Sequence, residues 1–404
     1  MADQDSIVIV GGGHAGAQLC GALAAAGRAR EVHLVCDDAE LPYHRPPLSK
    51  AFLKDAATRL QWHRPETWYR DAGITVHRAN PALKIDRTRR LVHLSSGDAL
   101  PYNTLVLATG ARARRLPHLP ESLSNVAVVR TAADAIRMRD LLNACHGVSV
   151  VGGGFIGLEI AATARALGKG VQVLESAPRL LMRGVSPQLS EHVLRTHCDH
   201  GIDVRVGVAV GGFEVAGDRL TKLAVDGVPQ DVELVVLGIG AVPDHDLASA
   251  AGLHCDNGIV VDEHMRTSDP AIFAIGDCTL FPEHATGRRI RLESVQNAND
   301  QARTAASAIL GEPRPYSAVP WFWSDQGDMR LQMVGLMPAE GVRHRRDGPT
   351  PHSFSILHYV GERLACVESV NAPKDHLAAR KLLEAGGTVP PGLACDPAIA
   401  LTPA

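Results

Sequence analysis

Short runs of consecutive apolar residues, each closed by glycine, mark the predicted strands. Residues 7–10 and 148–151 are β-branched runs that lead into glycine-rich turns, and a helical stretch follows each turn. Three further runs, residues 105–108, 234–237 and 272–275, also end near glycine. Short apolar runs between turn signals are typical of buried strands. Strands that alternate with helical stretches predict an α/β fold.

The pattern changes in the last fifth of the chain. Strand-like runs follow one another between residues 331 and 370, and a helical stretch occupies residues 373–386. We expect Leu377, Leu382 and Leu383 to form the buried face of that helix. The C-terminal part is therefore predicted to be a separate β-rich unit.

The two glycine-rich turns have the spacing of a dinucleotide-binding fingerprint. They read Gly11-x-Gly13-x-x-Gly16 and Gly152-x-Gly154-x-x-Gly157. The first glycine makes a tight turn, the second lets the backbone approach a pyrophosphate, and the third lets the helix pack on the strand. The N-terminus of that helix offers free N–H groups to phosphates. One such motif is weak evidence, but two in matching contexts predict one resident nucleotide and one that is exchanged.

An acid ends the strand that follows each fingerprint. Asp37 and Glu175 occupy these positions. A carboxylate here accepts hydrogen bonds from ribose hydroxyls and repels a 2′-phosphate, so Glu175 favours NAD over NADP. Arg179 is close in sequence and could hold a 2′-phosphate, which weakens this preference without reversing it. An ordinary solvated strand-end acid is the alternative interpretation of Glu175.

Composition and charge argue against several classes of function. The chain has 404 residues, and 41 Lys and Arg nearly balance 44 Asp and Glu, so neither nucleic acid nor a membrane is an expected partner. No signal peptide and no apolar run of roughly 20 residues is recognised, so we expect a soluble cytoplasmic protein. The 8 cysteines and 19 histidines are dispersed without metal-ligand spacing, and no metal site is predicted.

These landmarks, in this order, resemble the two-dinucleotide-domain flavoprotein reductases of the glutathione-reductase superfamily. Within that superfamily the chain is similar, along nearly its whole length, to the FAD-dependent ferredoxin reductases of oxygenase systems. The most specific stretches are RPPLSK at 45–50, GGGFIGLE at 152–159, NGIVVDEHMRTS at 257–268, ESVQN at 293–297 and PWFWSDQ at 320–326.

The resemblance implies an α/β fold with two Rossmann-like dinucleotide-binding domains, one for FAD and one for NAD, followed by a C-terminal α+β interface domain. It assigns a discontinuous FAD-binding domain to residues 1–113 and 242–317. The NADH-binding domain would occupy residues 114–241, and the interface domain residues 318–404.

The resemblance also implies which residues contact FAD and NADH. Asp277 would bind a ribityl hydroxyl, and the backbone of Val295 would meet the flavin ring. Leu83 stands where similar enzymes often have valine. The full set of cofactor-binding positions is Gly11, Gly13, His14, Ala15, Gly16, Asp37, Lys50, Leu83, Thr109, Gly110, Arg130, Gly152, Gly154, Phe155, Ile156, Gly157, Glu159, Glu175, Gly240, Gly276, Asp277, Glu293, Ser294, Val295 and Trp323.

Three residues are expected beside the reacting groups: Lys50, Glu159 and Trp323. In similar proteins the Lys–Glu pair lies by the flavin and the nicotinamide, where a fixed cation favours the reduced flavin. Alternatively, Lys50 is an exposed loop lysine and Glu159 a first-turn helix acid. Trp321 and Trp323 are two residues apart, so on a strand they share one face. Packing within the interface domain is the alternative role of that face.

The acceptor of the electrons is expected to be a separate protein. Relatives that relay electrons through thiols place cysteine just after the first βαβ unit, but residues 41–50 contain none. The resemblance implies a [2Fe–2S] ferredoxin that supplies a cytochrome P450 or a Rieske-type oxygenase. Its acidic surface would dock near Arg303 and Arg330. The alternatives are a rubredoxin reductase or NADH diaphorase, and a flavoprotein redox sensor of the apoptosis-inducing-factor type.

Overall fold

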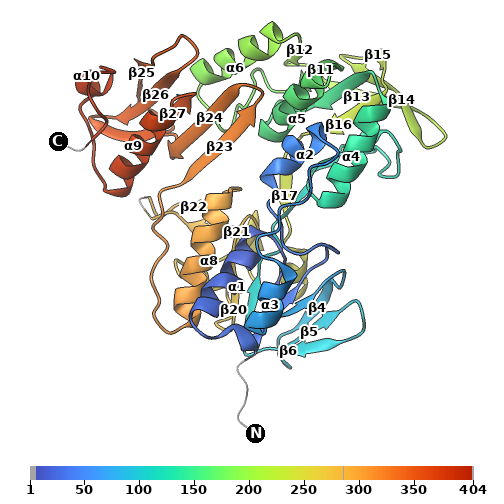
Figure 1. Cartoon of the computed structure of the whole chain (residues 1–404), viewed down its shortest axis with the longest axis vertical. Helices are drawn as coiled ribbons and strands as arrows, with labels where there is room; N and C mark the ends of the chain where they lie inside the picture. Colours follow the sequence, from blue (N-terminus) through green and yellow to red (C-terminus); the bar gives the residue numbers. More distant parts are fainter. Residues whose placement is uncertain (1–5, 285, 403–404) are drawn as a thin grey trace. The chain divides into compact units, whose positions relative to one another are not determined.

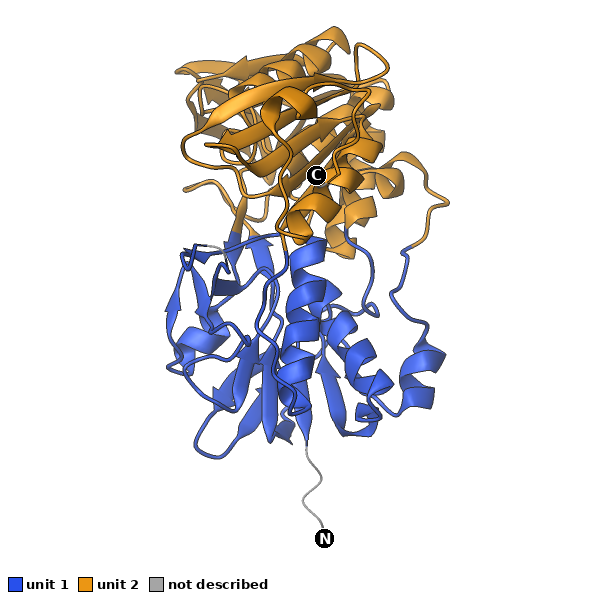
Figure 2. Ribbon diagram, turned by 90° about the vertical axis from the view of Figure 1, so that its left-hand side faces the viewer, with its two compact units in different colours: residues 1–45, 60–112, 242–318 blue, residues 46–59, 113–241, 319–404 orange. Residues whose placement is uncertain are grey.

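The chain divides into two compact units, which Figure 2 shows in different colours. The structure is a computed structural model that describes residues 6–284 and 286–402. Both units are built from segments that are distant in sequence. Unit 1 contains Met1–Arg45, Leu60–Arg112 and Val242–Ala318, and unit 2 contains Pro46–Arg59, Ala113–Ala241 and Val319–Ala404. The division into FAD, NADH and interface domains stays a proposal.

Unit 1 contains a five-stranded parallel sheet in the order β20-β7-β1-β2-β3. Its strands are β1 (Ile7–Val10), β2 (Val32–Val35), β3 (Thr75–His77), β7 (Thr104–Leu107) and β20 (Ile272–Ala274). Every residue of β1 and β20 is buried, as their apolar runs predicted. Helices α1 (His14–Ala25) and α8 (Val295–Ile309) pack against each other. Alanines at 298, 302 and 305 line the buried face of α8, and their small size permits this close approach.

Smaller elements complete unit 1. An antiparallel sheet contains β4 (Ala82–Asp86), β5 (Leu91–Leu94) and β6 (Ala99–Pro101), and another sheet contains β18 (Cys255–Asp256), β19 (Gly258–Val260), β21 (Thr279–Pro282) and β22 (Arg289–Ile290). The short helices are η1 (Ala29–Glu31), α3 (Glu66–Ala72) and α7 (Asp246–Ala250). Strands β8 (Ala111–Ala113) and β17 (Ala241–Pro243) pair where the chain crosses between the units.

Unit 2 has a second five-stranded parallel sheet, in the order β12-β11-β10-β16-β9. Its strands are β9 (Val126–Ala127), β10 (Gly147–Val151), β11 (Gly170–Glu175), β12 (Asp203–Val206) and β16 (Leu234–Leu237). The associated helices are η2 (Pro46–Ser49), α2 (Ala51–Lys54), α4 (Ala132–Ala144), α5 (Phe155–Ala166) and α6 (Pro187–Asp199). A three-stranded antiparallel sheet contains β13 (Val210–Ala216), β14 (Arg219–Val225) and β15 (Val228–Asp231).

The C-terminal part of unit 2 is an antiparallel sheet in the order β23-β24-β27-β26-β25. Its elements are β23 (Trp321–Gln326), β24 (Met329–Gly335), β25 (Val342–Asp347), β26 (Phe354–Val360), β27 (Arg363–Val370), α9 (Pro373–Glu384) and α10 (Pro391–Ala394). Helix α9 packs against β24 and β27, as Figure 1 shows. The fold predicted from the sequence, two Rossmann-like sheets and a C-terminal α+β part, is confirmed. Among the described residues, no helix is long and apolar enough to span a membrane.

The predicted buried face of α9 was partly wrong. Leu382 is buried, but Leu377 is 52% exposed. The helix instead buries His376, Ala379 and Leu382, which recur at three-residue intervals. Leu377 lies one residue, or about 100° around the helix, from that stripe. Leu382 and the partly buried Leu383 therefore pack as predicted, whereas His376 and Ala379 take the place on the contact face that the sequence pattern gave to Leu377.

Candidate functional site

The first glycine-rich turn of unit 1 is shaped for close backbone approach. Gly11 has φ +119°, and a Cβ there would lie 2.1 Å from the carbonyl oxygen of Ala108. A Cβ on Gly16 would lie 2.1 Å from the carbonyl oxygen of Gly11. Gly13 is different, because a Cβ there would meet nothing within 4 Å. The first and third glycines are thus required for packing, and the second leaves open space at the start of α1.

That open space lies at a helix N-terminus with no competing side chain. Helix α1 begins at His14, its cap residue Gly13 makes no side-chain hydrogen bond, and no acid lies in its first turn. The first backbone N–H groups of a helix lack partners within the helix, and the helix dipole is positive there. The turn can therefore receive a phosphate, and His14 and Ala15 lie in its first helical turn.

Three other predicted positions of unit 1 lie at strand ends and turns. Asp37 follows β2 and is exposed, with Oδ1 accepting a hydrogen bond from its neighbour's backbone. Gly110 and Gly276 follow β7 and β20 with φ of +76° and +84°. The carboxyl ends of these parallel strands lie at one edge of the sheet, where nucleotides bind in doubly wound folds.

The remaining predicted positions of unit 1 lie on β4, on loops and at the start of α8. Ser294 caps α8 by accepting a hydrogen bond from the backbone N–H of Asn297, and Val295 is the first helical residue. Glu293 pairs with Arg291 at 2.5 Å. Leu83 is 64% exposed on β4, so no packing role accounts for it. The hydroxyl of Thr109 donates to the carbonyl oxygen of Asp244, and Asp277 lies directly after Gly276.

Sequence reasoning missed Gln301, which supports the Gly276 turn. Its side chain is fully buried in α8, and its Oε1 accepts from the backbone N–H of Gly276 at 2.7 Å and from the hydroxyl of Thr279 at 3.0 Å. The two bonds tie the end of β20 to α8. A polar residue on the alanine-rich face of α8 was the available signal.

The second glycine-rich turn, in unit 2, repeats this geometry. Gly152 has φ +106°, and a Cβ there would lie 2.5 Å from the carbonyl oxygen of Gly238. A Cβ on Gly157 would lie 2.4 Å from the carbonyl oxygen of Gly152. Gly154 precedes α5 and makes no side-chain cap, and its Cβ would have only one ordinary contact, at 3.5 Å. This helix N-terminus can also receive a phosphate.

Around that turn, Phe155 is half-buried and Ile156 is 47% exposed. Gly240 follows β16 with φ +98°. The backbone N–H of Arg130 donates to Asp134 at the start of α4. All four predicted positions therefore lie in unit 2.

Glu175 ends β11 and is held in place by backbone groups. Its Oε2 accepts from the N–H of Gly153 at 2.6 Å, and its Oε1 accepts from the N–H of Ala177 at 2.7 Å. The carboxylate therefore lies beside the glycine turn, as the fingerprint predicts. Arg179 donates instead to the carbonyl oxygens of Met182 and Val185, at 2.8 and 2.9 Å. Its guanidinium is engaged by the backbone, so the structure gives no support for a 2′-phosphate site at Arg179.

Lys50 and Glu159 form a buried ion pair within unit 2. The Lys50 Nζ lies 2.6 Å from the Glu159 Oε2, and the two side chains are 20% and 3% exposed. Ser49 donates to the same oxygen at 2.5 Å, and Ser324 donates to the Oε1 at 2.7 Å. A buried carboxylate is stable only when donors satisfy it, and here one cation and two hydroxyls do so.

The donors continue inward from Ser324. The side-chain amide of Gln326 donates to the Ser324 hydroxyl at 3.2 Å, and the His197 Nε2 lies 2.8 Å from the Gln326 Oε1. Burial lowers the pKa of His197. Sequence reasoning missed Ser49, Ser324 and Gln326, although all three lie within or beside the most specific motifs. The network fixes the Glu159 carboxylate at its inner end, and the partly exposed Lys50 amine lies at its outer end.

Trp321 and Trp323 share one face of β23, as their spacing predicted. Their ring centroids are 5.6 Å apart. The guanidinium of Arg380 covers the Trp321 ring at 4.7 Å, and Trp321 packs against the core beneath α9. Trp321 thus has the packing role, and Trp323 remains a half-buried aromatic next to Ser324.

The two predicted docking arginines each have an acidic neighbour. Arg303 pairs with Asp300 in unit 1, and Arg330 lies 3.7 Å from Asp325 in unit 2. Both arginines are more than half exposed. Their acids reduce the net positive charge at each position, so the basic docking surface stays a prediction.

Cys36, the cysteine that follows β2, is not suited to relay electrons. Burial raises the pKa of the Cys36 thiol to about 12. A buried thiol with a raised pKa is a poor nucleophile at neutral pH. All eight cysteines are free thiols. Cys36 is therefore a packing residue, as the sequence favoured.

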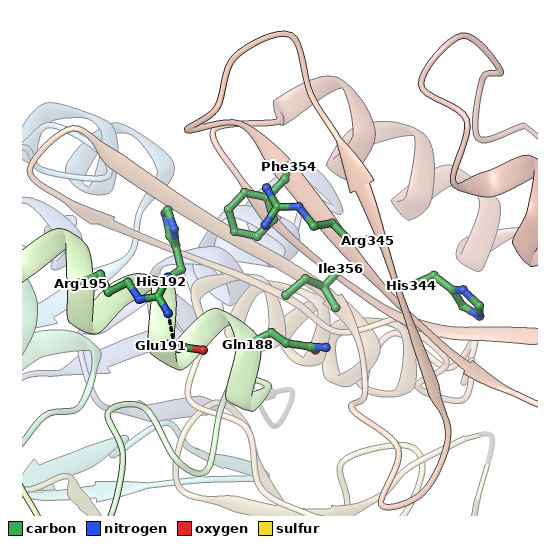
Figure 3. Close-up of a pocket in the computed structure, with 8 residues that line it drawn as sticks. All are labelled: Gln188, Glu191, His192, Arg195, His344, Arg345, Phe354 and Ile356. Carbon is green, nitrogen blue, oxygen red and sulfur yellow. Dashed lines mark hydrogen bonds and ion pairs between the residues drawn. The ribbon is translucent and has the colours of Figure 1, made fainter.

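A cavity of about 220 Å³ in unit 2 lies apart from the predicted positions (Figure 3). Side chains of α6, β25 and β26 line it, and Arg345 and His192 lie against the Phe354 ring. None of the predicted site residues lines this cavity.

Known proteins match the chain along nearly its whole length. Residues 5–302 match the family described as pyridine nucleotide-disulphide oxidoreductase, and residues 321–404 match the family described as reductase C-terminal. Rhodocoxin reductase of Rhodococcus erythropolis is 41% identical over 97% of this chain and 92% of its own length.

Two solved structures have nearly the same fold. The ferredoxin reductase for the CYP199A2 system from Rhodopseudomonas palustris has a TM-score of 0.93 and 42% identity, and the match covers 98% of each chain. A covalent putidaredoxin reductase–putidaredoxin complex has a TM-score of 0.93 and 39% identity, covering 98% of this chain and 97% of the other.

Proposed function

This chain belongs to the pyridine nucleotide-disulphide oxidoreductase family, and from that premise we propose an NADH-dependent, FAD-containing reductase of a [2Fe–2S] ferredoxin. The ferredoxin reductases of oxygenase systems are its relatives along nearly the whole chain, as its motifs predicted. The observation that carries the proposal is the pair of glycine-rich turns at residues 11–16 and 152–157, called the glycine cradles below. Each lies at the start of a helix whose cap residue makes no side-chain hydrogen bond, and the strand that follows each helix is succeeded by or ends in an acid, Asp37 or Glu175, as two separate dinucleotides require.

FAD fits the cradle of unit 1. Gly13, His14 and Ala15 would hold its pyrophosphate through backbone N–H groups, and Asp37 would accept hydrogen bonds from ribose. Asp277 would bind the ribityl chain. Bound FAD would accept a hydride from NADH and release electrons one at a time. The further predicted contacts belong to the same proposal: Lys50, Leu83, Thr109, Gly110, Arg130, Gly276, Glu293, Ser294, Val295 and Trp323.

NADH fits the cradle of unit 2. The first turn of α5 would hold its pyrophosphate, and the Glu175 carboxylate would accept hydrogen bonds from the ribose hydroxyls. The same charge would repel the 2′-phosphate of NADPH. The guanidinium of Arg179 donates to backbone carbonyl oxygens and is therefore not free to bind the 2′-phosphate of NADPH, which supports the preference for NADH.

The Lys50–Glu159 pair would orient reacting groups and exclude water. Glu159 is held by three donors, so it in turn fixes the Lys50 amine in one position without reorganisation during the reaction. The fixed Lys50 amine would place one positive charge beside the flavin, where negative charge would develop on reduction. Trp323, on the same strand as Ser324, would lie between the cofactor and the acceptor protein.

The acceptor is inferred from the absence of a thiol relay and from the relatives. Cys36, which follows β2, is buried with a raised pKa. One solved relative is covalently joined to putidaredoxin. A one-electron acceptor of this kind would dock on the surface that includes Arg303 or Arg330.

The first test is anaerobic reduction of a [2Fe–2S] ferredoxin by the purified yellow protein, driven by NADH. Parallel reactions replace NADH with NADPH and the ferredoxin with rubredoxin. Fast ferredoxin reduction with NADH alone is the expected result. Faster rubredoxin reduction would contradict the proposed acceptor, and equal rates with NADPH would contradict the role of Glu175. Flavin reduction with no electron transfer to either protein, and a long-lived complex with NAD, would favour a redox sensor.

A further inference from the structure

We propose that His14, His44 and His63 form a binding site for one divalent transition-metal ion of the zinc, nickel and copper class. No metal-ligand spacing marks this site in the sequence, because the three histidines come from separate segments. In unit 1 one ring nitrogen of each lies within 4.8 Å of one from each of the others. This inference rests on unit 1 alone and does not depend on the proposed reductase function.

The backbone holds two of the histidines side by side. Tyr43 and Trp62 form an isolated antiparallel bridge, and the backbone N–H groups of His44 and His63 donate to opposite strands at 2.9 and 2.8 Å. Their rings have centroids 4.0 Å apart. His14 is the first residue of α1, so the start of that helix determines its position.

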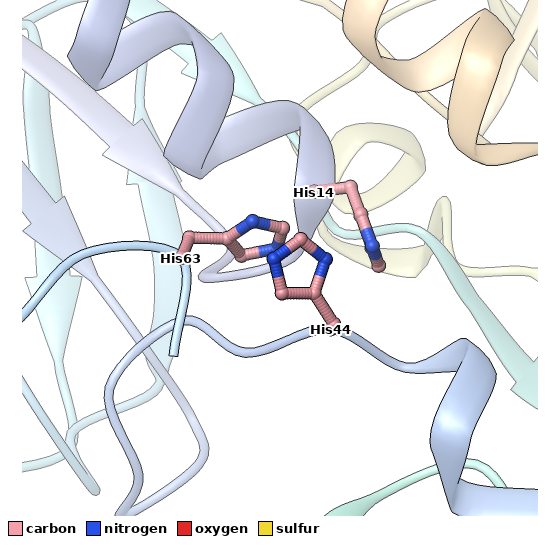
Figure 4. Close-up of side chains that lie close together, drawn as sticks. All are labelled: His14, His44 and His63. Atoms are coloured by element: carbon pink, nitrogen blue, oxygen red, sulfur yellow. The ribbon is translucent and has the colours of Figure 1, made fainter. Parts of the chain in front are cut away.

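The three rings lie close together, as Figure 4 shows. The centroid of the His14 ring lies 4.5 Å from that of His63 and 5.5 Å from that of His44. Three imidazoles on one tetrahedral metal, with metal–nitrogen bonds of about 2.0 Å, have ligand nitrogens about 3.3 Å apart. Side-chain rotations that move each nitrogen by about 1 Å would achieve this from the observed separations.

One of the three ring nitrogens is buried and open to a ligand. The Nε2 of His63 is buried without a hydrogen-bond partner among the described residues. A metal ion bound there would satisfy this buried polar atom. His44 is exposed, so an ion can enter from solvent.

The chemistry of the ligands determines which ions fit. Three imidazoles with no carboxylate suit zinc, nickel and copper, whereas magnesium and calcium require oxygen ligands. Arg45 and Arg64 lie near His63, and their charge opposes a cation. We therefore expect micromolar rather than nanomolar affinity.

A bound ion would connect three parts of the chain. His44 precedes and His63 follows the segment Pro46–Arg59, which belongs to unit 2 and carries Lys50. One ion bound to His14, His44 and His63 would link the residues that flank this segment to the start of α1. The site would thus hold the two ends of the helical segment that carries Lys50.

The test uses the untagged flavoprotein after removal of metal with a chelator. Zinc is titrated by competition with a chromophoric chelator, and X-ray absorption at the zinc edge reports the ligands. The variants are His44→Gln, which changes an exposed side chain, and His63→Gln. His77→Gln is the matched control, because His77 forms a two-histidine pair with His33 in the same unit at 3.2 Å.

We expect one zinc ion per chain with three imidazole ligands. Zinc should bind at least tenfold more weakly to His44→Gln and to His63→Gln, and with unchanged affinity to His77→Gln. The thermal midpoint should rise with zinc concentration in the wild-type protein and in His77→Gln only. Binding well below one equivalent, equal binding in His44→Gln, or loss of binding in His77→Gln would overturn the proposal. Magnesium is expected to give no competition at the same concentration, and competition by it would count against an imidazole site.

Discussion

Replacing Ser324 by alanine should both destabilise unit 2 and slow the reduction of the flavoprotein by NADH. The hydroxyl is fully buried and donates at 2.7 Å to the Glu159 Oε1, and the Glu159 side chain is only 3% exposed. A hydrogen bond to a charged group contributes about 1.5–3 kcal/mol. The substitution also removes the acceptor of the Gln326 amide. We therefore expect a loss of about 2–3 kcal/mol.

Ser190→Ala is the matched control for this substitution. Ser190 is also buried in unit 2, but its hydroxyl donates at 2.7 Å to the neutral carbonyl oxygen of Leu180. A neutral hydrogen bond contributes about 1 kcal/mol. With a urea dependence of about 2 kcal/mol per M, the midpoint should fall by about 1 M in Ser324→Ala and by about 0.5 M in the control.

Stopped-flow reduction by NADH supplies the second readout. A carboxylate that loses one of its three donors can rotate, and the Lys50 amine moves with it. Misplacement of a positioning group costs about 10- to 100-fold in rate. Ser190→Ala should leave this rate unchanged. Equal losses of stability in the two variants, or an unchanged rate in Ser324→Ala, would refute the view that Ser324 positions Glu159.

Three further predictions test the nucleotide cradles and the docking surface. Glu175→Ala should raise the KM for NADH and narrow the preference for NADH over NADPH in steady-state assays; unchanged discrimination would exclude a ribose role. Arg303→Glu should weaken ferredoxin reduction while ferricyanide reduction is retained, and equal loss with both acceptors would indicate a flavin or folding defect. Gly11→Ala should destabilise unit 1 by more than about 3 kcal/mol in urea, because the added Cβ meets the carbonyl of Ala108 at positive φ. Gly21→Ala, in the middle of α1 with open space around it, should be neutral or stabilising by up to about 1 kcal/mol, and a similar loss in both would contradict the strain argument.

The sequence by itself determined the features that depend on neighbouring residues. The runs at 7–10 and 148–151 became buried strands, and the glycines after them adopted the turns that their spacing predicted. Glu175 lies beside its glycine turn because an acid at that strand end is placed by the local βαβ geometry. Strands, glycine turns and strand-end acids can be predicted from the sequence because backbone sterics and side-chain periodicity act over a few neighbouring residues.

Only the tertiary structure decided which distant residues meet. Ser324 lies 165 residues from Glu159 in the sequence, and the pattern of apolar and polar residues around either one does not indicate that they meet. His14, His44 and His63 converge although their sequence spacing matches no metal motif. Leu377 is exposed because the packing of α9 on its sheet, rather than its own hydrophobicity, selected the buried face. Contacts of this kind depend on how whole elements pack, so they follow from the assembled fold and not from local pattern.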